Sequence, residues 1–117
     1  MQDEARHVAY GTMHLRYRLE TDPSMAEDFH TYLDKGEEII AMIFSTPEIV
    51  EPTAILAAGS VEAACEMGAA AGDVLRRQII GDYLKRCDHA GLDRRGRLHL
   101  PDALIDGVPG AKAEVVV

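Results

Sequence analysis

The chain has 117 residues, of which 47% are hydrophobic and 27% are charged, an ordinary composition for one globular domain. Its formal net charge of −8 argues against nucleic acid and anionic membrane surfaces as partners, and no apolar run approaches the roughly 20 residues of a membrane span. Aromatic residues reach only 5% and Trp is absent, so the core must be built mainly from Ala, Leu, Ile, Val and Met. Such a core favours closely packed helices.

The first predicted helix runs from about Asp3 to Leu19. A helical projection places Glu4 in the middle of an apolar stripe, pointing at the core, with His7 one turn later at the edge of that stripe. A buried carboxylate is costly unless it is paired, protonated or bound to a metal. The alternative is that Glu4 is simply a favourable negative charge at the positive end of the helix dipole.

A break follows, because Asp22 can cap a new helix and Pro23 suits its first turn. The second helix is predicted from Pro23 to about Phe44. Its charged side chains should face solvent, and Glu38 is the expected exception because it lies near the apolar stripe. His30 is expected to be a surface or half-buried histidine.

Pro47 and Pro52 bracket a stretch that is predicted to be irregular. A short helix is expected over residues 54–58, and Ser60 can then cap a third long helix. That helix can bend at its glycines, which weaken it by about 1 kcal/mol each relative to Ala. Its strongest part, from Asp73 to about residue 90, has an apolar stripe at helical spacing.

After this helix the sequence no longer has a regular helical pattern. Residues 94–97, Arg-Arg-Gly-Arg, are predicted to be a solvated basic turn, and residues 98–105 are expected to pack back on the helices as a short element. The remaining chain is expected to be loose. The predicted organisation is therefore an all-α helical bundle over residues 1–106, with three long helices and short extras, and a C-terminal tail over residues 107–117.

Residues 3–11, Asp-Glu-Ala-Arg-His-Val-Ala-Tyr-Gly, resemble the second ligand motif of the ferritin-like di-iron or manganese–iron carboxylate proteins. That group includes the ribonucleotide reductase small subunit, ligand-binding oxidases and multicomponent monooxygenases. The resemblance implies that Glu4 and His7 bind iron or manganese and that Asp3 orients a ligating histidine. A complete site in this group draws on four helices. Because the motif begins at residue 3, the resemblance also implies the C-terminal part of a ferritin-like protein, with an incomplete or partner-dependent metal site.

Two functional hypotheses follow. The chain is a metal-binding piece of a di-iron oxidase or oxygenase, or it is a non-catalytic helical packing and interaction module. We assign no catalytic residue, and we expect the isolated chain to hold iron loosely or not at all. Three amphipathic helices cannot close a four-helix layer, which predicts a homodimer or a complex with a partner subunit. Cys65 and Cys87 lack metal spacing and are interpreted as reduced thiols of a cytoplasmic protein.

Overall fold

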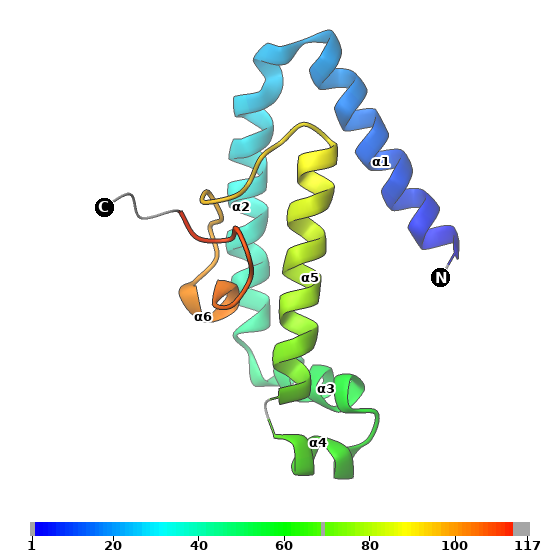
Figure 1. Cartoon of the computed structure of the whole chain (residues 1–117), viewed down its shortest axis with the longest axis vertical. Coiled ribbons are helices and arrows are strands. Elements are labelled where there is room, and N and C mark those ends of the chain that lie inside the picture. Colours follow the sequence, from blue (N-terminus) through cyan, green and yellow to red (C-terminus); the bar gives the residue numbers. More distant parts are fainter. Residues whose placement is uncertain (1, 69, 114–117) are drawn as a thin grey trace.

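The computed structural model describes residues 2–68 and 70–113, and the secondary structure in those ranges is entirely helical. The elements, labelled in Figure 1, are α1 (Gln2–Thr21), the 3-10 turn η1 (Pro23–Met25), α2 (Ala26–Phe44), α3 (Pro47–Ala58), α4 (Val61–Met67), α5 (Ala70–His89) and α6 (Asp102–Ile105). The prediction of an all-α fold is confirmed, with the first break at Asp22, whose side chain accepts a hydrogen bond from the backbone N–H of Ser24.

Helix α5 is the element that organises the molecule. It contacts α1, α3, α4 and α6, while α2 meets it through side chains near Tyr83. The short helices α3 and α4 lie together at one end, where α2 ends and α5 begins (Figure 1). Helix α1 slants away from α2 and α5 toward its N-terminus, so most of its surface is left without a neighbour.

Two predictions about helix boundaries were wrong. The stretch after Pro47 is helical because proline suits the first turn, where an N–H would have no partner, and the helix continues past Pro52. The third long helix is divided, because Gly68 has a φ of 59° and ends α4 before α5 begins. Only glycine adopts that backbone conformation without strain.

The buried apolar side chains form two clusters along α5. One joins Leu19 of α1 to Cys87 and Leu92, with Phe29 and Leu33 of α2 packed against it. The other joins α5 to the C-terminal segment and contains Ile80, Leu84, Ile105, Val108 and Ala111. The first residues of the tail that was predicted to be loose from residue 107 are therefore packed on α5, as far as residue 111. Residues 114–117 of that prediction lie outside the described residues.

Candidate functional site

The predicted metal ligands lie on the exposed part of α1. Asp3, Glu4 and His7 are all exposed, so the expectation that Glu4 points at the core was wrong. The helical projection identified the apolar stripe, but α1 packs on the molecule only near its C-terminal end, at Leu19. Among residues 2–68 and 70–113 no three His, Cys, Asp or Glu side chains gather as metal ligands would. The assignment of Glu4 and His7 as ligands remains a prediction.

We expected no second Glu-x-x-His pair downstream of the first, and this was wrong, because Glu27 and His30 form one in α2. The structure uses these two residues separately. Glu27 lies at the surface, 3.5 Å from the guanidinium of Arg97, whereas His30 is buried and directed at Arg94. A cation against the imidazole opposes binding of a second cation. We therefore do not interpret this second pair as a metal site.

The most concentrated polar chemistry in the described chain surrounds Arg94, whose side chain is 0% exposed. Its Nε and Nη2 atoms donate to the two carboxylate oxygens of Glu37 at 3.0 and 2.7 Å. Nη2 also donates to Asp34 at 2.6 Å, and Nη1 lies 3.1 Å from Nδ1 of His30. The hydroxyl of Tyr83 donates to Glu37 at 2.7 Å. We call these five residues the Arg94 cluster.

The electrostatics of the cluster follow from burial and pairing. Burial opposes the charge of Arg94, but its hydrogen bonds to Glu37 and Asp34 outweigh burial and raise the pKa of the guanidinium. The bond to Arg94 lowers the pKa of Asp34. Burial, followed by the charges of Arg97 and Arg94, lowers the pKa of His30. Arginine can only donate, so Nδ1 of His30 must accept, which requires a neutral imidazole.

Three expectations about these residues were wrong. Arg94 is not part of a solvated turn, and His30 is buried rather than at the surface. Glu37 is buried in α2, while Glu38, the expected exception, is exposed. The sequence does show opposite charges on α2, which is acidic, and on residues 94–97, which are basic. It does not show which of these charges pair.

The Arg94 cluster fastens the segment after α5 to α2. The backbone N–H of His99 donates to Glu37 at 2.7 Å, and the ring of His99 lies 3.1 Å from Glu38 and 3.5 Å from Asp34. Within the described residues, every buried side-chain nitrogen and oxygen has a hydrogen-bond partner. A satisfied polar network of this kind fixes one arrangement of the chain.

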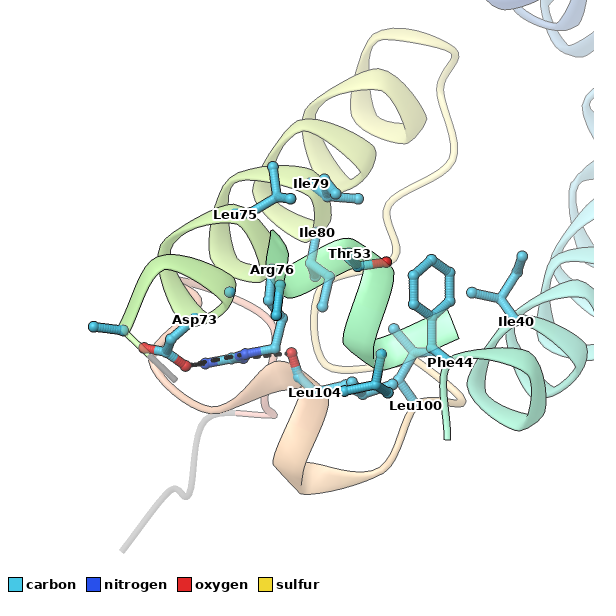
Figure 2. A pocket seen from close by; sticks show the side chains of 14 residues that line it. Ile40, Phe44, Thr53, Asp73, Leu75, Arg76, Ile79, Ile80, Leu100 and Leu104 are labelled. Atoms are coloured by element: carbon cyan, nitrogen blue, oxygen red, sulfur yellow. Dashed lines mark hydrogen bonds and ion pairs between the residues drawn. The ribbon is translucent and has the colours of Figure 1, made fainter. Parts of the chain in front are cut away.

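A separate feature, the apolar groove, lies where α2, α3, α5 and the C-terminal segment meet. Its volume is about 580 Å³, within the range of ligand pockets, and apolar atoms dominate its surface. Figure 2 shows Ile40 and Phe44 of α2 on one side and Ile79 and Ile80 of α5 on another, with Leu100 and Leu104 closing the lower edge. At that edge Arg76 binds Asp73 and donates to the carbonyl oxygen of Leu104 at 2.6 Å.

Large apolar side chains remain exposed on the helices that form the groove. They are concentrated in the C-terminal half of α2, in α3 and in the N-terminal half of α5: Ile39, Ile40, Met42, Ile43, Phe44, Ile49, Val50, Leu56, Val74 and Ile79. Leu56 is 81% exposed and Met42 is 65% exposed. Single exposed apolar residues are normal, but a concentration on three adjoining helices is unusual for a surface that stays in water.

No protein-family model, curated protein or solved structure matches this chain. Within the described residues, no single helix has the length and apolar character needed to cross a membrane. The segments Pro23–Phe44 and Pro47–Ala58, bent by 82° at the break between them, meet that requirement only when they are taken together, by length and composition.

Proposed function

We propose that this chain is a helical interaction module that docks another protein chain through the apolar groove. The observation that carries the proposal is the exposure of large apolar side chains on α2, α3 and α5 around a groove with an apolar lining. Burying one such side chain contributes about 1.5–3 kcal/mol relative to full exposure. A partner that covers several of them therefore gains the driving force that docking requires, after the entropic cost of association.

The polar groups near the groove support docking rather than catalysis. The buried polar atoms of the Arg94 cluster all have hydrogen-bond partners, and Arg76 donates both to Asp73 and to the carbonyl oxygen of Leu104. A catalytic site needs a nucleophile, acid or base that can reach a substrate. In the described part of the chain, the groove offers apolar side chains at the positions where such groups would lie.

The proposal is tested by sedimentation velocity, with the chain alone and with a helical peptide that has Leu at positions i, i+3, i+4 and i+7 and Gln elsewhere. We expect self-association or peptide binding, and we expect Ile40→Glu to abolish it. Tyr17→Glu is the matched control, because Tyr17 is also exposed but lies on α1. Circular dichroism verifies that both variants are folded. A monomer that binds no peptide at micromolar concentration contradicts the proposal.

The metal hypothesis is retained as a second proposal, that the chain is a partner-dependent part of a di-iron or manganese–iron oxidase. It is supported by the resemblance of residues 3–11 and by the exposure of Glu4 and His7, which leaves both open to a metal held jointly with another chain. Anaerobic loading with ferrous iron, followed by metal analysis, tests this. Metal that remains bound after gel filtration in the wild type, and is lost in His7→Ala, would support it.

A further inference from the structure

The helices that form the apolar groove carry mainly acidic side chains; Arg76, which lines the groove, is paired with Asp73. From Gly36 to Leu75 the sequence contains no Lys, Arg or His, whereas it contains seven acidic residues from Glu37 to Asp73. This span forms the end of α2, all of α3 and α4 and the beginning of α5, which together provide most of the groove lining. Most of the groove lining therefore comes from a 40-residue stretch that carries acidic residues and no basic ones.

Several of these carboxylates are free to meet a partner. Glu37 is used by Arg94, and Asp73 pairs with Arg76 and Arg77. In contrast, Glu48 and Glu51 of α3, and the two glutamates of α4, are exposed and form no ion pair within the described residues. Helix α3 also lines the groove, and α4 packs directly against α3 (Figure 1).

We propose that the occupant of the groove is an amphipathic helix of another protein, whose apolar stripe is flanked by Lys and Arg. This inference rests on the docking function proposed above and adds the chemistry of the partner. An amphipathic helix presents apolar side chains at i, i+3, i+4 and i+7, which suits an apolar groove between helices. Basic flanks would lie over α3 and α4 and complement their carboxylates.

Other occupants fit the same surface less well. A second copy of the chain, docked through this face, would bring acidic helices against acidic helices, which is unfavourable. A small apolar molecule could fill the groove, but it would leave the exposed carboxylates of α3 and α4 without a partner. A phosphate-bearing ligand or an anionic lipid surface is opposed by the negative charge.

The test uses three helical peptides with the same leucine stripe, whose remaining positions are Lys, Gln or Glu, and measures binding by fluorescence anisotropy. We expect the Lys peptide to bind about tenfold more tightly than the Gln peptide at low salt, and the Glu peptide to bind least. The advantage of the Lys peptide should shrink at high salt, because exposed charges are screened.

A charge-matched pair of variants locates the effect. The double variant Glu48→Gln/Glu51→Gln should lose several-fold of the preference for the Lys peptide. The double variant Glu20→Gln/Asp28→Asn changes the net charge equally, but it alters exposed residues of α1 and α2 and should leave the preference unchanged. Equal effects in the two variants would show that the preference comes from net charge alone and would overturn the assignment to α3.

The remaining outcomes separate this inference from the docking function. Equal affinity for all three peptides would refute the basic partner while leaving apolar docking in place. A monomer that binds none of them would refute both. Self-association that excludes the peptides would make the groove an interface between copies of this chain. Binding to phosphatidylcholine vesicles in preference to every peptide would identify a lipid surface instead, and would also overturn the inference.

Discussion

Replacing Glu37 with Gln should destabilise the fold more than any other single charge removal on α2. Gln keeps the shape of the side chain, but it removes the charge opposite Arg94. Its amide N–H groups would also face a hydrogen-bond donor where the carboxylate had an acceptor. Removing one partner of a buried ion pair costs about 3–5 kcal/mol. Asp34 remains bound to Arg94, so we expect the lower end of that range, about 3 kcal/mol. A domain of this length has a total stability of about 6–18 kcal/mol.

The assay is urea unfolding followed by far-ultraviolet circular dichroism, with Glu38→Gln as the control on the neighbouring, exposed residue. That control should change the free energy of unfolding by no more than about 1 kcal/mol, as expected for an exposed pair. The double variant Glu37→Gln/Arg94→Met should recover part of the lost stability, because it removes both buried charges while the amide oxygen can still accept from Tyr83 or His99. If Glu37→Gln costs no more than Glu38→Gln, the carboxylate is not desolvated and the reasoning is wrong.

The remaining predictions concern pH, backbone and metal. The pKa of His30 is held below its ordinary value of 6.5, chiefly by burial. Stability should therefore be constant above about pH 6.5 and fall as the pH decreases toward the folded-state pKa, and His30→Gln, which keeps an acceptor for Arg94, should reduce that slope in urea unfolding. Gly36→Ala should raise the free energy of unfolding by about 0.5–1 kcal/mol, since Gly36 is helical and an added Cβ meets nothing within 4 Å. Gly96→Ala should lower the melting temperature, since the φ of Gly96 is 72° and an added Cβ would lie 3.0 Å from the Cα atom of Ala113. Glu4→Gln should leave the melting temperature unchanged without metal, because Glu4 is exposed, and a lower melting temperature of the variant only in the presence of iron would show that the metal is bound there.

The sequence predicts the elements well where local rules decide. The helical class, the cap at Asp22 and the long helix through Ile80 and Leu84 follow from caps and apolar spacing, and the structure contains all three. The prolines were misinterpreted because a proline can begin a helix as readily as end one. Pro47 occupies the first turn of α3, where it replaces an N–H that has no partner.

The sites were harder to predict because they depend on which surfaces meet. The apolar stripe around Glu4 indicates burial only if another element covers it, and in this structure only the C-terminal part of α1 is covered. Arg94 lies in a charged stretch that reads as solvated, and its burial depends on carboxylates 57 and 60 residues earlier in the chain. The residue pattern of α2, or of the segment that contains Arg94, does not indicate that these side chains pair.

One wall of the groove is present only while the C-terminal segment stays attached to α2. Leu100 and Leu104 line the groove, and they follow directly after His99, which is tied to Glu37. A helix that contacts these leucines is thermodynamically linked to the folding of the segment, so each must stabilise the other by the same free energy. Acidification favours the charged form of His30, which cannot accept a hydrogen bond from Arg94. It would therefore loosen the groove wall, which lies at the opposite end of the same segment. The affinity for the proposed helical partner would thus depend on pH through His30, which does not line the groove.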